Sequence, residues 1–165
     1  MKHAEIISFV HCAGITTSDT IEDFDEYHLR TISEINVFSA LKLLNYLVPF
    51  MKKNSSAILL GSNLSYIGVP NSLSYTISKH ALLGLMRSIS KDLAYKEIYS
   101  CCICPGFVET DMLRGLAKSR NVDMNDFKAI QLIHRFIEPK EIAELIYFCS
   151  EHPIVNGSLI QANLG

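Results

Sequence analysis

Residues 57–79 read AILLGSNLSYIGVPNSLSYTISK, and the rest of the chain is organised around this stretch. The apolar run at 57–60 predicts a buried strand. A loop rich in serine, asparagine, glycine and proline follows it, and an apolar-periodic helix is expected to begin near Tyr75. The stretch therefore supplies Ser62 from a strand end, and Tyr75 and Lys79 from the first turns of a helix.

Tyr75 and Lys79 are four residues apart, so on a helix they share one face. A free phenol has a pKa of about 10 and is a poor acid–base group at neutral pH. A lysine cation beside it, and the N-terminal end of the helix dipole, would both lower that pKa. Ser62 could then hold a substrate oxygen while Tyr75 gives or takes its proton. The alternative is a solvated helix face, because seven tyrosines make one Tyr-x3-Lys spacing ordinary by chance.

Length and composition narrow the class of protein. The chain has 165 residues, 48% of them hydrophobic and 19% charged, so residues 1–165 are expected to form one domain with a substantial core. The formal net charge is -2 and no basic cluster occurs, which argues against nucleic-acid binding. No apolar run reaches the roughly 18 residues that a membrane span needs, so no membrane partner is expected.

The cysteine pattern favours a reducing cytoplasm over a disulfide framework, because the number is odd and three of the residues are clustered. The five are Cys12, Cys101, Cys102, Cys104 and Cys149. Cys101 and Cys104 have the C-x2-C spacing of metal or thiol redox sites. However, residues three apart on a strand point to opposite faces. Small buried hydrophobic side chains are therefore the favoured interpretation, and no metal site is predicted.

Apolar runs and turn residues divide the chain into alternating strands and helices. Strands are predicted at residues 5–10, 57–60, 99–104 and 157–162, and helices at about 22–48, 75–93 and 139–150. This alternation is typical of α/β folds, here a partial Rossmann-like, doubly wound parallel sheet of about four strands with helices on both faces. Residues 107–131 are expected to form a long loop with short helical pieces, of the kind that serves as a lid.

The predicted topology places three turns at one edge of the sheet. Ligands of such sheets bind at the carboxyl ends of the strands. Gly14, Ser62 and the pair Pro105-Gly106 each follow a predicted strand end. We therefore expect the binding site at this edge.

The helix at residues 32–48 is apolar around nearly its whole circumference. Such a helix is buried on more than one side, which requires the sheet and a further partner. Asn36 is its polar exception, and a hydrogen bond to local backbone would be its ordinary role. Gly84 weakens the helix at 75–93 by roughly 1 kcal/mol relative to alanine, which close packing against another backbone would explain. We expect a homo-oligomer that forms through these two helices.

Several short motifs occur in a fixed order along nearly the whole chain. They are His-Cys-Ala-Gly at 11–14, Asn36, Ser62, Tyr75 thirteen residues later, Lys79, Pro-Gly-Phe-Val-Glu-Thr at 105–110, the segment 135–143, and Asn-Leu-Gly at 163–165. In this order and spacing they resemble the classical short-chain dehydrogenase/reductase family, and especially its 3-oxoacyl-carrier-protein reductase-like members. The family has Asn-Asn-Ala-Gly, catalytic Asn, Ser and Tyr-x3-Lys, Pro-Gly-x3-Thr and a terminal Asp-Gly-Gly at these places.

The resemblance implies an NAD(P)-dependent oxidoreductase that transfers hydride between a nicotinamide and a small carbonyl or alcohol substrate. Its catalytic residues would be Asn36, Ser62, Tyr75 and Lys79, with Tyr75 as the acid in reduction, Ser62 as the donor to the carbonyl oxygen, Lys79 on the nicotinamide ribose and Asn36 positioning a water. The cofactor would contact Ala13, Gly14, Tyr75, Lys79, Pro105, Gly106, Val108 and Thr110. The resemblance leaves open which of NAD or NADP binds, because the residues that choose between them precede this segment in the family.

The chain departs from the family at its beginning. It resembles the C-terminal two-thirds of the family's fold and contains no G-x-G-x-x-G pyrophosphate loop. His11 and Cys12 replace two asparagines. The chain is thus either a fragment of a longer reductase or a shortened relative, and we expect it to bind dinucleotide weakly by itself. The alternative function is a non-catalytic, dimerising remnant of such an enzyme.

Overall fold

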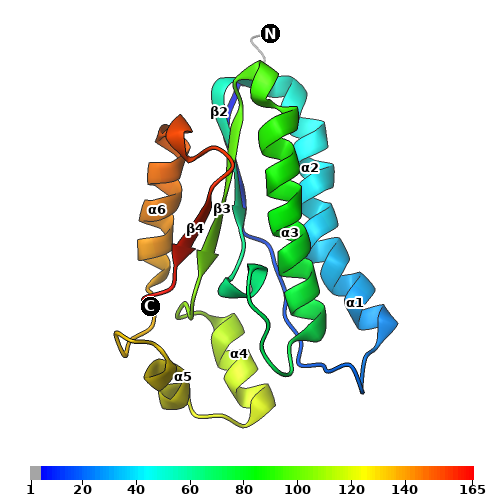
Figure 1. Cartoon of the computed structure of the whole chain (residues 1–165), viewed down its shortest axis with the longest axis vertical. Helices are drawn as coiled ribbons and strands as arrows, with labels where there is room; N and C mark the ends of the chain where they lie inside the picture. The colour runs from blue at the N-terminus through cyan, green and yellow to red at the C-terminus, as the bar shows by residue number, and fades with distance from the viewer. Residues whose placement is uncertain (1–4) are drawn as a thin grey trace.

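A computed structural model of the chain describes residues 5–165. Its centre is a four-stranded parallel sheet in the order β1-β2-β3-β4 (Figure 1). The strands are β1 (Ile6–His11), β2 (Met51–Leu60), β3 (Tyr99–Pro105) and β4 (Leu159–Ala162). The predicted partial Rossmann-like sheet is confirmed, because helices cover both of its faces (Figure 1).

The crossovers between strands supply those helices. They are α1 (Glu26–Ser33), α2 (Ser39–Leu47), α3 (Leu73–Asp92), α4 (Asp111–Arg120), α5 (Met124–Ile130) and α6 (Pro139–Glu151). Figure 1 shows α2 and α3 side by side on one face of the sheet and α6 on the other. The α4 and α5 helices lie beyond the carboxyl ends of the strands (Figure 1).

Side chains on β3 point alternately to the two faces of the sheet and so contribute to two separate layers of the core. Cys102 and Cys104 pack toward α3 with Leu82 and Met86, whereas Cys101 packs toward α6 with Cys149. The predicted opposite orientation of Cys101 and Cys104 is therefore confirmed. Within residues 5–165 all five cysteines are free, and no group of three or more His, Cys, Asp or Glu side chains is placed to hold a metal ion.

The long helix predicted at about 22–48 is divided in the structure. It begins at Glu26, where the Asp25 side chain accepts the first capping hydrogen bond, and one π-helical turn, Glu34–Phe38, separates α1 from α2. In that turn the backbone N–H of Ser39 donates to the carbonyl of Glu34. Periodicity in the sequence does not indicate such a turn, because one extra residue hardly changes an apolar pattern that surrounds the whole helix.

One predicted boundary differs from the structure. β2 begins at Met51 rather than at residue 57, since the apolar run marks only the part of the strand that is buried on both faces. Its polar first half pairs with β1 across a register irregularity between Ile6 and Ser8. The helical pieces predicted within residues 107–131 are α4 and α5, which share a small core of Leu113, Ala117, Phe127 and Phe136. Among the described residues no helix is long and apolar enough to cross a membrane.

Candidate active site

A cavity of about 1170 Å³ lies at the carboxyl ends of the strands, where the sequence predicts a binding site. The turns after β1, β2 and β3, the first turns of α3, and the α4–α5 segment all contribute to its wall. Its lining includes eight of the ten predicted site residues: Gly14, Ser62, Tyr75, Lys79, Pro105, Gly106, Val108 and Thr110. Ala13 and Asn36 are the predicted site residues that do not line it.

Ser62 is held in place by the short helical turn that it begins. Its Oγ accepts a hydrogen bond from the backbone N–H of Leu64 at 3.2 Å and donates to Asn63 Oδ1 at 3.0 Å. The backbone N–H of Ser62 in turn donates to Ser65 Oγ at 3.1 Å. This capping arrangement fixes the serine at the strand end, facing the cavity beside Tyr75.

Tyr75 projects from the first turn of α3 and is partly buried. Burial raises the pKa of its phenol above the ordinary value, and the neighbouring Ser62 hydroxyl opposes that effect only in part. The expectation that Lys79 brings this pKa below its ordinary value is thus not met in the structure, because desolvation of the phenolate is the larger effect. At neutral pH Tyr75 keeps its proton.

Lys79 is 5% exposed and lies one helical turn beyond Tyr75. Its Nζ donates to the carbonyl of Leu60 at 2.8 Å and lies 5.5 Å from the centroid of the Tyr75 ring. Burial lowers the pKa of the Lys79 ammonium to about 8, although the nearby thiols of Cys102, Cys104 and Cys12 act in the opposite direction. The ammonium is therefore mostly charged at pH 7, and its pKa lies about 2.5 pH units below the ordinary lysine value.

Asn36 is fully buried in the π-helical turn and connects two parts of the site. Its Nδ2 donates to the carbonyl of Ile15 at 3.0 Å and to Ser78 Oγ at 3.0 Å, and its Oδ1 accepts from the backbone N–H of Ile15 at 2.8 Å. Ser78 Oγ donates onward to the carbonyl of Tyr75 at 2.8 Å. Asn36 thus ties the loop after β1 to the helix that carries Tyr75, and its backbone partner is distant in sequence rather than local.

The turn after β1 comes close to the same side chains. A Cβ added to Gly14 would lie 3.4 Å from Asn36 Oδ1 and 3.7 Å from Lys79 Nζ. His11 is buried at the end of β1, and its Nε2 pairs with Ser39 Oγ at 2.8 Å. Burial, and then the charge of Lys79, lowers the pKa of His11, so the imidazole is neutral at pH 7. His11, which stands where the family has an asparagine, therefore holds this turn against α2 through Ser39.

The segment after β3 forms the opposite wall of the cavity. The backbone N–H of Gly106 donates to the carbonyl of Ala162 at 3.0 Å. Val108 forms a parallel bridge with Ile137 that uses the carbonyl of Phe107 and the N–H of Glu109, so the N–H of Val108 faces away from that bridge. The Thr110 side chain caps α4, where it accepts from the backbone N–H of Leu113.

Two residues that the sequence did not single out help to organise the site. The carboxylate of Asp19 accepts hydrogen bonds from the backbone N–H and the hydroxyl of Ser74 at the start of α3. Arg120, at the end of α4, donates to Ser18 Oγ at 2.8 Å and to Ser72 Oγ at 2.7 Å. It thereby ties the end of α4 to both loops at the mouth of the cavity. Each contact joins residues at least 48 positions apart, which no local pattern reveals.

Comparison with known proteins supports the class of protein that the site residues indicate, an oxidoreductase. Residues 2–165 match the profile of the family described as Enoyl-(Acyl carrier protein) reductase. A 3-oxoacyl-[acyl-carrier-protein] reductase, FabG, of Thermotoga maritima is 27% identical over 96% of this chain and 65% of its own. The human dehydrogenase/reductase SDR family member 2, mitochondrial, is 30% identical over 97% of this chain and 59% of its own.

A solved structure supports the same family. The crystal structure of a short chain dehydrogenase family protein from Francisella tularensis superposes with a TM-score of 0.93, at 29% identity over 99% of this chain and 72% of that one. The chain therefore belongs to the short-chain dehydrogenase/reductase family, and the resemblance to its 3-oxoacyl-carrier-protein reductase-like members is confirmed. The chain spans between 48% and 65% of the length of the first curated relatives that it matches.

Proposed function

We propose that this chain carries the catalytic part of an NAD(P)-dependent oxidoreductase that transfers hydride between a nicotinamide and a small carbonyl or alcohol substrate. The observation that supports this most directly is the convergence of Ser62, Tyr75 and Lys79 on one large cavity at the carboxyl edge of the sheet. The names of the relatives agree, since they are reductases and dehydrogenases. A structural neighbour of 19% identity, the angucycline C-6 ketoreductase LanV, is described with bound NADP.

The described residues fit the nicotinamide end of such a cofactor. Gly14 leaves space beside Lys79 Nζ, and the N–H of Val108 is directed away from its bridge partner. Lys79 could hold the ribose hydroxyls, while Val108 and Thr110 could hold the carboxamide. When bound, the nicotinamide would supply or accept the hydride. The pyrophosphate would need backbone N–H groups at a glycine-rich turn, which the described residues do not contain.

The protonation states favour reduction at neutral pH. The raised pKa keeps the Tyr75 hydroxyl protonated and ready to donate to the oxygen of a carbonyl whose carbon receives the hydride. The Ser62 hydroxyl would turn its single proton from Asn63 Oδ1 to the same oxygen, where negative charge develops. The Lys79 ammonium would stabilise the phenolate that remains. Oxidation of an alcohol would require Tyr75 to lose its proton first, and should therefore need a higher pH.

The exposed surfaces support self-association through the helices at 32–48 and 75–93. Phe38, Leu41 and Leu43 of the first helix, and Ile77 of α3, are all more than two-fifths exposed in the single chain. Exposed apolar side chains on two neighbouring helices are of the kind that an interface covers. The free, mostly buried thiols are consistent with a reducing compartment, and we propose the cytoplasm.

The test is carbonyl reduction by Tyr75→Phe, measured through loss of NADPH or NADH absorbance with a panel of aldehydes and ketones. The assay uses the chain alone and the chain joined to the N-terminal portion of a relative. Loss of the proton donor should lower kcat by about 10²- to 10⁴-fold. Tyr95→Phe, at an exposed tyrosine far from the cavity, is the matched control. Near-normal turnover by a folded Tyr75→Phe protein would refute the assignment.

A further inference from the structure

Arg120 places a positive charge in the wall of the large cavity, at the end of α4. Burial lowers the pKa of its guanidinium, and no acidic side chain acts in the opposite direction. The group is still charged at neutral pH, because the ordinary pKa of arginine is 12.5. Arg30, Arg114 and Arg135 each form an ion pair with a glutamate. Within residues 5–165 Arg120 forms none, so this charge has no contacting carboxylate.

Three hydrogen bonds hold the guanidinium of Arg120 in one orientation. Its Nε donates to Ser18 Oγ at 2.8 Å, and its Nη2 donates to Ser72 Oγ at 2.7 Å and to the carbonyl of Asn71. The other terminal nitrogen, Nη1, has no acceptor among the described residues. Solvent reaches Nη1, since it is not one of the enclosed, unpaired side-chain atoms of residues 5–165. Two N–H groups of a fixed cation are therefore open to a ligand.

Ser18 and Ser72 each contribute one further donor. A hydroxyl has a single proton, and both hydroxyl oxygens already accept a hydrogen bond from Arg120. Neither hydroxyl donates to another group of the described residues, so both protons are free to be donated. Ser18, Ser72 and Arg120 all line the large cavity. Donors gathered around one cation, without a nearby carboxylate, form a set that fits an anion.

The other charged side chains of this cavity are engaged elsewhere. The carboxylate of Asp19 accepts two hydrogen bonds from Ser74, and that of Asp23 accepts two from Thr20. Lys79 lies beside Tyr75, where the proposed function assigns it to the nicotinamide ribose. A second anion in the cavity would therefore meet its free donors at the end of α4.

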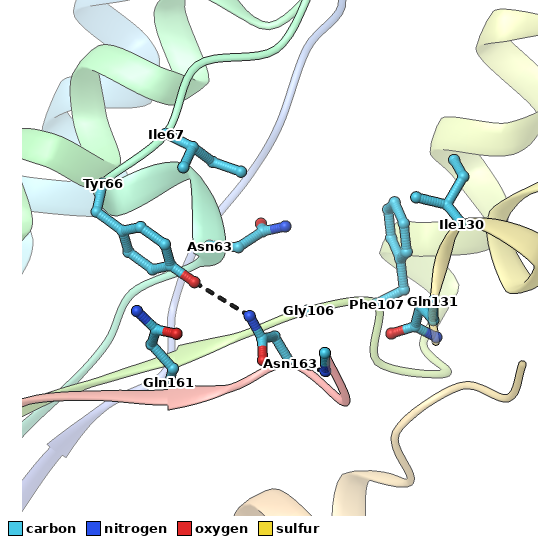
Figure 2. Close-up of a pocket in the computed structure, with 10 residues that line it drawn as sticks. Asn63, Tyr66, Ile67, Gly106, Phe107, Ile130, Gln131, Gln161 and Asn163 are labelled. Atoms are coloured by element: carbon cyan, nitrogen blue, oxygen red, sulfur yellow. Dashed lines mark hydrogen bonds between the residues drawn. The ribbon is translucent and has the colours of Figure 1, made fainter. Parts of the chain in front are cut away.

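The part of the cavity near β4 has a different character. A smaller cavity of about 300 Å³ adjoins it there and shares Ile67, Phe107 and Ile130 with it (Figure 2). No charged side chain lines the smaller cavity. Its buried Gln131 Oε1, which has no hydrogen-bond partner within residues 5–165, is enclosed beside Gly106. This part suits the apolar body of a substrate, and binding of a charged group is left to Arg120.

We propose that Arg120, Ser18 and Ser72 bind a carboxylate of the substrate, which makes the substrate class an oxo acid. Nη1 and the two hydroxyls would donate to the carboxylate oxygens. The carbonyl half of this inference rests on the proposed function, whereas carboxylate binding does not. Ser72 precedes Tyr75 by three residues at the start of α3, a rise of about 4.5 Å in a helix. A carbonyl and a carboxylate a few carbon atoms apart, as in a 4-oxo acid, would reach both residues.

The test is an NMR titration of the full chain with levulinate (4-oxopentanoate), and methyl levulinate is the matched neutral ligand. Levulinate should shift the signals of Arg120, Ser18 and Ser72 and bind about tenfold or more tightly than the ester. Arg120→Gln keeps an N–H donor but removes the charge, so it should abolish this preference. Loosening of α4 by the substitution would affect both ligands alike, which is why the ratio of the two affinities is measured.

Arg114→Gln is the control, because Arg114 is on the same helix and does not line the cavity. Ser18→Ala, at an exposed position, is a second variant and should weaken levulinate binding by about fivefold or more if Arg120→Gln fails to fold. Equal affinity of the native chain for acid and ester would overturn the proposal. The same ratio in Arg120→Gln as in the native chain, or shifts centred on Lys79, would overturn it as well.

Turnover separates this inference from the proposed function. It is measured with the chain joined to the N-terminal portion of a relative, with levulinate and methyl levulinate as substrates. Reduction of both with the same kcat/KM would support hydride transfer and show that the substrate class is wrong. Binding of levulinate at Arg120 without reduction of either compound would support the carboxylate site and count against the proposed reaction.

Discussion

Replacing Lys79 by methionine should remove a pH dependence of stability that arises from the buried ammonium. The pKa of Lys79 is about 8 in the folded protein against an ordinary value of 10.5. Between these two values the unfolded chain binds a proton that the folded protein has released, so the free energy of unfolding rises with pH. A difference of 2.5 pKa units corresponds to about 3 kcal/mol, gained progressively from about pH 8 to 10.5.

Urea unfolding of the native chain and of Lys79→Met at several pH values across this window measures the effect. The difference in unfolding free energy between the two proteins should change by about 3 kcal/mol across it. Titration of the neighbouring thiols of Cys102 and Cys104 occurs in both proteins and largely cancels in that difference. Lys91→Met is the control, because Lys91 lies on the same helix and is exposed.

Two results would show that the reasoning is wrong. If Lys79→Met and Lys91→Met gave the same pH slope, the Lys79 ammonium would be hydrated in the folded protein. A slope of the opposite sign would mean that the hydrogen bond with the Leu60 carbonyl holds the charge more strongly than burial opposes it. In that case the pKa of Lys79 would lie above its ordinary value, and the ammonium would remain available to stabilise the Tyr75 phenolate at every pH below that pKa.

Three further predictions concern α4, self-association and cofactor binding. Arg120→Ala should release α4 and speed its amide hydrogen exchange by about tenfold or more. Arg114→Ala, at an exposed ion pair on the same helix, should leave that exchange rate unchanged and is the control. An unchanged exchange rate in Arg120→Ala would mean that Arg120 does not hold α4 in place. Leu41→Asp should shift the chain toward monomer in sedimentation, with Tyr95→Asp as the control, and a native chain that is already monomeric at micromolar concentration would contradict the proposed interface. Calorimetry should find NADH and NADPH bound by the chain alone no more tightly than about 1 mM, and micromolar binding would show that the nicotinamide half of the site suffices.

The open edge of β1 gives a physical reason to compare the chain with a version that has the N-terminal portion of a relative. Ile7 is 73% exposed and Val10 38% exposed on this edge strand, which pairs with β2 alone among the described strands. Edge strands with exposed apolar side chains tend to associate. We therefore expect the joined version to be more soluble and to bind dinucleotide more tightly than the chain alone.

The sequence by itself determined the alternating strands and helices, the parallel sheet and the edge at which the site lies. These follow from local patterns: a strand buried on both faces is a short apolar run, and a turn after it contains glycine or proline. The spacing of Ser62, Tyr75 and Lys79 placed them at one strand end and one helix face, and the prediction that they are catalytic came from the resemblance to the family.

The tertiary structure decided what depends on burial and on contacts between distant residues. Desolvation raises the pKa of Tyr75, which the i, i+4 spacing with Lys79 did not predict, because the extent of burial is set by the packed cavity rather than by the sequence around it. Asn36 reaches Ser78 across 42 positions, and Arg120 reaches Ser72 across 48. The unpaired oxygen of Gln131 lies beside Gly106 only because the ends of two strands and the segment after α5 meet there. Such contacts arise from the packing of the whole chain, and no short stretch of the sequence predicts them.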